Sequence, residues 1–270
     1  PGVFDMKAGV TACLKVQEYI ARGWIQPQKK IRFLFTTDEE VVSLHSRKLI
    51  EEFALESDLV LVPEPPLPGG ALKTSRNGVG TYTLRVQGRS AHTGLDPDKG
   101  ISAVDELARQ ILSIHALSAP ELGTNVAVNV VRGGTVHNVI PEFAEGDIDT
   151  RFKTVEEGER VDIALHQLEP FRTGITLKLD GLIDRPPLFK LKRSSELFRR
   201  AQQIGSKLGF VLEEGESGGA SDGNFASALG IPTLDGLGIN GGGAHANNEH
   251  IEVSAIAPRI ALLALLIDQL

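Results

Sequence analysis

Two apolar runs near the start of the chain lead into carboxylates, and this pattern constrains the fold more than any other feature. Residues 33–35 are followed, after a short polar stretch, by Glu39 and Glu40, and residues 59–62 are followed by Glu64. Ligands of open α/β sheets collect at the carboxyl ends of strands, and clustered acids repel one another without a cation. We therefore expect two buried strands that deliver acids to one metal site. The alternative is that acids follow strands only because strands end at the solvated surface.

The outer parts of the chain alternate helical and strand patterns. Apolar residues recur at helical spacing in residues 8–20, 43–53, 195–208 and 254–270. Short apolar runs, typical of strands covered on both faces, occupy residues 31–35, 59–62 and 231–234. This order predicts an α/β fold in which helices flank a parallel-type mixed sheet.

A different pattern lies between these parts, after a Pro- and Gly-rich stretch at residues 63–70. Strand patterns with one polar face begin near residues 80, 126, 147 and 175, and helical patterns begin near 101 and 155. Thr154 and Glu157 are expected to form a capping box at the second helix. The order βαββαβ predicts a ferredoxin-like α+β insert at residues 77–183, within a domain made of residues 1–76 and 184–270.

Composition limits the class of partner. The formal net charge is −7 and no long Lys/Arg run occurs, so we expect neither a nucleic acid nor a membrane as partner. No stretch approaches the roughly 20 apolar residues of a membrane span. Cys13 is the only cysteine, which permits a reducing compartment. We expect a cytoplasmic protein that acts on a small molecule or peptide, with a periplasmic or secreted location as the alternative.

A glycine-rich loop near the C-terminus carries two histidines, His245 and His250, just after Gly241–Gly243. Glycines let a backbone approach a ligand closely, and imidazole is a common metal ligand. Either histidine is a candidate ligand, and the alternative for each is a surface loop residue.

Taken in order, these segments resemble the motifs of the M20 metallopeptidase family. The matching motifs are Phe4-Asp5-Met6-Lys7, Thr37-Asp38-Glu39-Glu40, Pro63-Glu64-Pro65, Gly88-Arg89-Ser90-Ala91-His92, Asn138-Val139-Ile140-Pro141 and His245. The carboxypeptidase G2 (glutamate carboxypeptidase) branch is the most similar. The resemblance implies a zinc aminopeptidase-like catalytic domain at residues 1–76 and 184–270, interrupted by a lid and dimerisation domain at residues 77–183.

The resemblance also implies a metal site and its chemistry. It implies a pair of zinc ions bridged by Asp5, with Glu40 and His245 on one ion and Glu64 on the other. Two neighbouring cations acidify a shared water and stabilise a developing oxyanion. Glu39 is then the general base that takes the proton of the water.

Two residues of the insert match the family's lid motifs. His92 is implied to reach across from a partner subunit and stabilise the oxyanion, which would make a homodimer necessary for catalysis. Its alternative is a histidine at the end of a hairpin. Asn138 is implied to contact substrate, and its alternative is a plain turn former.

Two arginines and one glycine are implied to bind substrate. Arg151 and Arg185 correspond to arginines that receive a substrate carboxylate, for which a guanidinium fork is suited. An ordinary ion pair with a nearby aspartate is the alternative. Gly219 lies in a glycine-rich stretch that resembles the family's substrate loop, and a simple loop is the alternative.

Two departures from the family pattern are visible. No counterpart of the family's His-x-Asp motif precedes Asp5, so we expect an N-terminally truncated member that retains one metal or none and has impaired activity. Val42 and His45 stand where relatives usually have glycines, which predicts a bulkier turn and makes His45 an additional candidate ligand.

These features predict a zinc-dependent hydrolase that cleaves an amide bond and releases a C-terminal glutamate-like amino acid. Two alternatives stay open. One is an N-acyl-amino-acid deacylase of the same family, similar to acetylornithine deacetylase or to a desuccinylase. The other is a non-catalytic binding or dimerisation module derived from the family.

Overall fold

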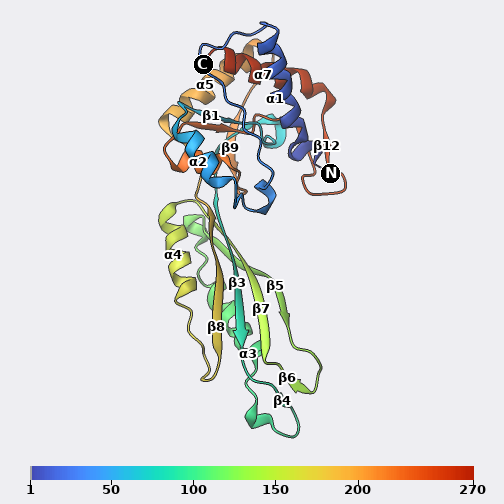
Figure 1. Cartoon of the computed structure of the whole chain (residues 1–270), viewed down its shortest axis with the longest axis vertical. Helices are drawn as coiled ribbons and strands as arrows, with labels where there is room; N and C mark the ends of the chain where they lie inside the picture. Colours follow the sequence, from blue (N-terminus) through green and yellow to red (C-terminus); the bar gives the residue numbers. More distant parts are fainter. Residues whose placement is uncertain (1) are drawn as a thin grey trace. The chain divides into compact units, whose positions relative to one another are not determined.

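The structure, a computed structural model, describes residues 2–270. Its contacts divide the chain into two compact units, which are described separately: unit 1 is Pro1–Arg76 with Leu188–Leu270, and unit 2 is Asn77–Pro187 (Figure 1). The predicted second boundary falls between residues 183 and 184. In the structure β8 continues to Arg185, so residues 184–187 belong with unit 2.

Unit 1 contains four main helices around a small sheet. Its helical segments are η1 (Val3–Lys7), α1 (Ala8–Ala21), η2 (Glu39–Val41), α2 (Arg47–Leu55), η3 (Pro68–Gly70), α5 (Lys192–Lys207), α6 (Gly223–Ala228) and α7 (Val253–Asp268). Its strands are β1 (Val60–Val62), β2 (Leu72–Arg76), β9 (Glu214–Ser217), β10 (Thr233–Asp235), β11 (Gly241–Gly242) and β12 (His250–Ile251). Helices α1 and α5 both contact α7, and their apolar faces share one core with β2 and β10.

The main sheet of unit 1 is mixed, with strand order β1-β10-β2-β9. Strands β1 and β10 are parallel, as are β2 and β9, whereas β10 and β2 are antiparallel. The pairing of Val62 with Asp235 places the ends of two apolar runs side by side, two residues before Glu64. The predicted α/β class with a mixed sheet is confirmed.

The predicted strand at residues 31–35 is wrong. Within the part of the chain that the structure describes, no strand pairing involves this segment. Ile31 and Phe33 pack against the core, but Leu34 and Phe35 are exposed, so the segment is covered on one side only. An apolar run becomes a strand only where a neighbouring strand satisfies its backbone N–H and C=O groups, and sequence does not report that neighbour.

Unit 2 consists of long strands and two helices. Its strands are β3 (Gly78–Gln87), β4 (Ala91–His92), β5 (Asn125–Gly133), β6 (Val139–Ile140), β7 (Phe143–Phe152) and β8 (Thr176–Arg185). Its helical segments are η4 (Pro97–Lys99), α3 (Ala103–His115), η5 (Pro120–Leu122) and α4 (Val155–His166).

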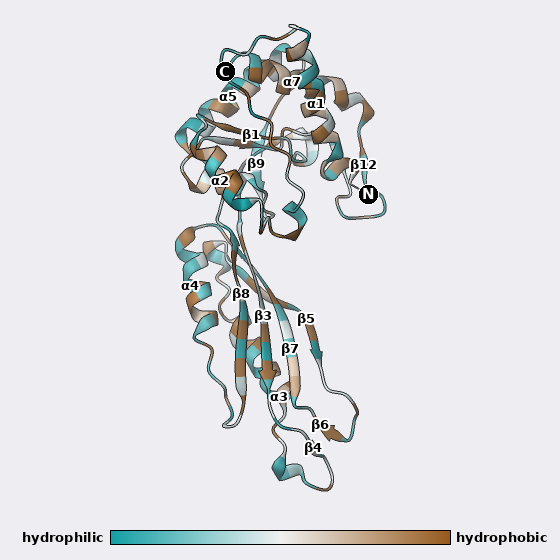
Figure 2. Cartoon of the chain, in the orientation of Figure 1, coloured by the Kyte–Doolittle hydropathy of each residue, from teal (hydrophilic) through white to brown (hydrophobic). Residues whose placement is uncertain are grey.

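The four long strands of unit 2 form an antiparallel sheet in the order β5-β7-β3-β8, and α3 and α4 pack against it (Figure 1). In β3, Tyr82, Leu84 and Val86 are buried and the residues between them are polar. Hydrophilic and hydrophobic residues are interspersed along the long strands of unit 2 (Figure 2). This strand order and the βαββαβ sequence of elements agree with the predicted ferredoxin-like topology. No helix of residues 2–270 combines the length and apolar character needed to cross a bilayer.

Candidate metal centre

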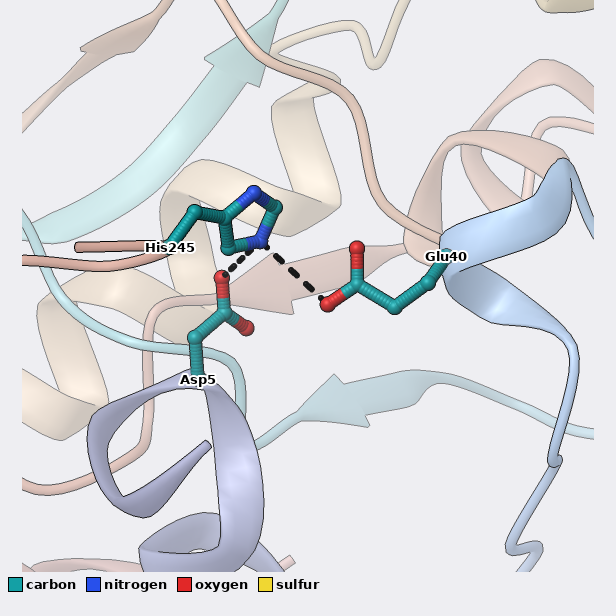
Figure 3. A group of neighbouring side chains, drawn as sticks. All are labelled: Asp5, Glu40 and His245. Atoms are coloured by element: carbon teal, nitrogen blue, oxygen red, sulfur yellow. Dashed lines mark ion pairs between the residues drawn. The ribbon is translucent and has the colours of Figure 1, made fainter. Parts of the chain in front are cut away.

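Three acidic or imidazole side chains from distant parts of unit 1 meet at one point. Asp5 lies in η1, Glu40 in η2, and His245 in the loop that joins β11 to β12. One ligand atom of each lies within 4.8 Å of the others. The Nε2 atom of His245 is 3.4 Å from Oδ2 of Asp5 and 3.3 Å from Oε1 of Glu40 (Figure 3). The structure thus brings together three of the four predicted metal ligands.

Local backbone features hold two of these ligands in place. His245 has a φ of 61°, a left-handed conformation that non-glycine residues rarely adopt and that is concentrated at functional sites. The loop around it is closed by hydrogen bonds from the N–H of Ala246 to the carbonyl of Gly243 and from the N–H of Glu249 to the carbonyl of Ala246. The carboxylate of Glu249 in turn accepts the N–H groups of Phe4 and Asp5.

A close contact brings the start of α1 next to the end of β1. A Cβ on Gly9 would lie 2.0 Å from the carbonyl oxygen of Pro63, so only glycine permits this approach. The contact joins the segment after Asp5 to the residue before Glu64.

The electrostatics of the group fit a cation. Burial raises the pKa of Asp5 and the nearby Glu40 carboxylate raises it further, while His245 and more distant cationic side chains lower it. Two carboxylates that repel each other beside an imidazole are a suitable ligand set for a divalent metal, since a cation removes the repulsion. The Asp5 side chain is only 23% exposed, whereas those of Glu40 and His245 are 63% and 65% exposed, so the group is open to solvent on one side.

The fourth predicted ligand, Glu64, lies nearby. Among the described residues it is not part of the group of three, but Asp5 and Glu39 are close enough to affect its titration. Burial, assisted mainly by the negative charge of Asp235, raises the pKa of Glu64 to about 8. Burial thus favours the protonated form of Glu64 in the metal-free protein.

Glu39 and its neighbour Glu40 occupy different environments at the start of η2. Glu39 is half-buried and acts electrostatically on Glu64 and Arg76, whereas Glu40 is exposed and faces His245. The two adjacent carboxylates therefore interact with different residues. His45 is exposed, and its backbone N–H donates to Asp38.

A buried polar network next to Glu64 was missed in the sequence pattern. Asp235 is fully buried, and its carboxylate accepts Nε and Nη2 of Arg76 and the hydroxyl of Ser221. Arg76 also donates to the carbonyl oxygens of Gly219 and Ala220, so it holds the predicted substrate loop. The sequence pattern could have indicated Asp235, because this acid follows the apolar run at residues 231–234 much as Glu64 follows the run at residues 59–62.

The two predicted lid residues lie side by side within unit 2. Strands β4 and β6 pair His92 with Val139, the residue after Asn138, and the N–H of Thr93 donates to the carbonyl of Asn138. The Nδ1 atom of His92 accepts the N–H groups of Gly94 and Leu95. In a neutral imidazole this assigns the proton to Nε2, which leaves the exposed side of the ring as a donor.

The two predicted carboxylate-binding arginines also lie in unit 2. The guanidinium of Arg151 binds Asp149 with both Nε and Nη2, at 2.8 and 2.6 Å, so its fork has an internal partner. Arg185 is buried at the end of β8. For Arg151, the structure therefore shows the ion pair that was the alternative interpretation, and a guanidinium that already has a carboxylate partner.

Comparison with known proteins identifies related sequences. A model of the peptidase family M20/M25/M40 matches residues 1–269. The chain is 29% identical over 280 residues to carboxypeptidase G2 of Pseudomonas sp. (strain RS-16), covering 100% of this chain and 66% of that protein. It is 27% identical over 270 residues to succinyl-diaminopimelate desuccinylase of Azoarcus sp. (strain BH72), covering 95% and 70%. The chain thus spans about two thirds of the length of these curated relatives.

Solved structures share the fold. An M20 family metallo-carboxypeptidase from Sulfolobus solfataricus superimposes with a TM-score of 0.77 at 16% identity, covering 99% of this chain and 76% of the other. A tripeptidase from Staphylococcus aureus also gives a TM-score of 0.77, at 21% identity, covering 99% and 71%. At these identities the likeness concerns the fold alone.

Proposed function

The chain belongs to the peptidase family M20/M25/M40, and on that premise we propose that it is a zinc-dependent hydrolase that cleaves an amide bond and releases a C-terminal glutamate-like amino acid. The observation that carries the proposal is the convergence of Asp5, Glu40 and His245 within 4.8 Å. Three segments far apart in the sequence meet there with a ligand set that suits a divalent cation.

Asp5, Glu40 and His245 are the residues that would hold one metal ion, and Glu64 is assigned to a second ion. When bound, such a cation supplies a water of lowered pKa and an electrophile for the scissile carbonyl. Glu39, half-buried and beside the ligands, takes a proton at its carboxylate and returns it to the leaving nitrogen.

We assign oxyanion stabilisation to His92, acting from the partner subunit of a homodimer. Its Nδ1 is engaged by two backbone N–H groups, so Nε2–H is available to donate to the developing negative charge. Asn138, which lies next to it, is assigned to substrate contact. Unit 2 would then serve as the lid and dimerisation domain.

Substrate binding is assigned to Arg151, Arg185 and the loop at Gly219. Because Arg151 already binds Asp149, a substrate carboxylate must displace that partner or be received by Arg185. The second candidate is an N-acyl-amino-acid deacylase, an activity in line with the desuccinylase among the relatives. Paired assays with an N-acyl-L-glutamate and an N-succinyl-amino acid separate the two.

The test of the proposal is Glu39→Gln, because loss of the base removes proton transfer but no metal ligand. We expect hydrolysis to fall by about 10²- to 10⁴-fold while bound zinc, measured by plasma mass spectrometry, stays constant. Glu52→Gln, at an exposed position of α2, is the control and keeps full activity. Loss of zinc from the Glu39 variant would show that Glu39 and Glu40 are exchanged in role.

The assay is run on this chain and on a clone that includes any coding sequence upstream of Pro1, in order to test the expected His-x-Asp segment. Zinc binding with hydrolysis supports the enzyme. If both proteins bind substrate analogues but hydrolyse nothing with any divalent metal, the chain is a non-catalytic module of the family.

A further inference from the structure

Glu249 holds the backbone around the metal ligand Asp5 without being a metal ligand itself. Its Oε1 atom accepts the N–H groups of Phe4 and Asp5, each at 3.0 Å, and its Oε2 atom accepts the N–H of Gly2. These hydrogen bonds, the one from Asp5 first, hold the pKa of Glu249 below its usual range. A carboxylate that accepts several backbone N–H groups is a strong, charge-assisted acceptor.

The same loop carries the ligand His245, four residues before Glu249. The hairpin around this loop also sits directly on η1. A Cβ on Gly241 would lie 2.8 Å from the ring of the buried Phe4, and β12 contacts η1. Glu249 therefore links the segment that carries Asp5 to the loop that carries His245, at the place where the two ligands face each other.

We propose that Glu249 is a positioning residue that sets the spacing of Asp5 and His245 and so preorganises the metal site, an inference that rests on the metal centre of the proposed function. A metal site loses affinity when the groups that orient its ligands are removed, because the ligands must then be ordered at the expense of binding energy. Glu249 orients Asp5 through its peptide N–H rather than through its side chain.

The geometry predicts an order among substitutions. Glu249→Ala removes all three acceptor contacts. Glu249→Gln keeps one acceptor oxygen for Phe4 and Asp5 but presents an amide N–H₂ toward the N–H of Gly2, so it keeps part of the function. Glu252→Gln and Glu252→Ala are matched controls, because Glu252 is an exposed glutamate just after β12.

The experiment measures metal binding and backbone protection on the purified chain. Co²⁺ affinity and its visible absorption spectrum report the ligand geometry, and hydrogen exchange at the amides of Phe4 and Asp5 reports the Glu249 contacts in the metal-free protein. We expect Glu249→Ala to weaken Co²⁺ binding by about 10- to 100-fold, to alter the spectrum and to speed exchange at both amides. Glu249→Gln is expected to lie between this variant and the parent, and both Glu252 variants to match the parent.

Three outcomes decide the proposal. Unchanged Co²⁺ affinity and spectrum in Glu249→Ala overturn it. A loss of affinity that disappears when binding is measured well below the variant's thermal midpoint also overturns it, because that pattern indicates a purely structural role. If the parent chain binds no Co²⁺, the metal centre of the proposed function is wrong, and hydrogen exchange alone then tests Glu249. In that case, equal exchange at the Phe4 and Asp5 amides in the parent and in Glu249→Ala overturns the role of Glu249.

Discussion

At the scale of single residues, the turn after Glu39 and Glu40 contains a valine in a conformation suited to glycine. Val42 has a φ of 66°, and the next residue, Ser43, has a φ of 51°. A β-branched side chain in the left-handed region costs roughly 1–2 kcal/mol. Because position 42 carries valine instead of the expected glycine, the turn that presents Glu40 is strained.

We expect Val42→Gly to raise the free energy of unfolding by about 0.5–1 kcal/mol, because relief of strain exceeds the entropic cost of glycine. Urea denaturation followed by circular dichroism measures the change. Val41→Gly is the control, since Val41 is exposed but has no positive φ, and it is expected to destabilise. Equal destabilisation by the two substitutions would contradict the strain.

At the scale of elements, the start of α4 shows how tertiary contacts redirect a predicted motif. Thr154 caps the helix by accepting the N–H of Glu157, as expected. The Glu157 side chain does not complete the capping box. It binds the Arg160 guanidinium twice, at 2.8 Å, and accepts the hydroxyl of Thr124 at 2.6 Å, so the helix is tied to the segment before β5.

This network predicts a pH dependence of stability. The hydrogen bonds from Arg160 and then Thr124 lower the pKa of Glu157 to about 2, below its unfolded value near 4.5. Its stabilisation is therefore present above pH 4.5 and is lost as pH falls through 2. We expect Glu157→Gln to lower the free energy of unfolding by about 1–2 kcal/mol at pH 7 and by less at pH 3, measured by urea denaturation.

Glu159→Gln, an exposed change on the same helix, provides the reference and should show no such pH dependence. A difference between Glu157→Gln and the parent that is as large at pH 3 as at pH 7 would refute an ionised Glu157 as the source.

At the scale of the whole molecule, each unit has its own apolar core, and the sheet of unit 2 has two edges. Strand β5 forms one edge and exposes Val131, which is 55% accessible, while β8 forms the other and exposes Leu182, which is 50% accessible. Exposed apolar edges are sites where another chain pairs. The longer exposed stretch of β5 makes it the expected contact of the proposed homodimer.

Val131→Lys is expected to weaken self-association at least about tenfold, because it places an unpaired charge in the dimer contact. Sedimentation velocity over a concentration series measures the dimer dissociation constant. Leu182→Lys makes the same change on the opposite edge and should leave that constant unchanged. If Leu182→Lys dissociates the dimer and Val131→Lys does not, the interface lies at β8 and the assignment to β5 is wrong.

The predicted elements of unit 2 agree closely with the structure because each is encoded locally. The alternation along β3 and the apolar stripe of α3 depend on one buried face, which the sequence period reports directly. By contrast, the absence of a strand at residues 31–35 and the burial of Asp235 depend on tertiary contacts that no local pattern reports. A strand needs a neighbouring strand, and the local sequence of residues 31–35 does not report whether one is present. A buried acid needs a partner, and the partner of Asp235 is Arg76, which lies far away in the sequence.

By itself the sequence determined the fold class, the βαββαβ order of the insert and the family, because periodicity and ordered motifs are properties of the chain. Only the tertiary structure decided that Asp5, Glu40 and His245 lie within 4.8 Å of one another, that Arg151 is engaged by Asp149, and that Glu249 binds the backbone beside Asp5. The contacts among Asp5, Glu40 and His245, and the contact of Glu249 with Asp5, join residues separated by tens to hundreds of positions. Their geometry depends on how the elements pack, which no local pattern contains.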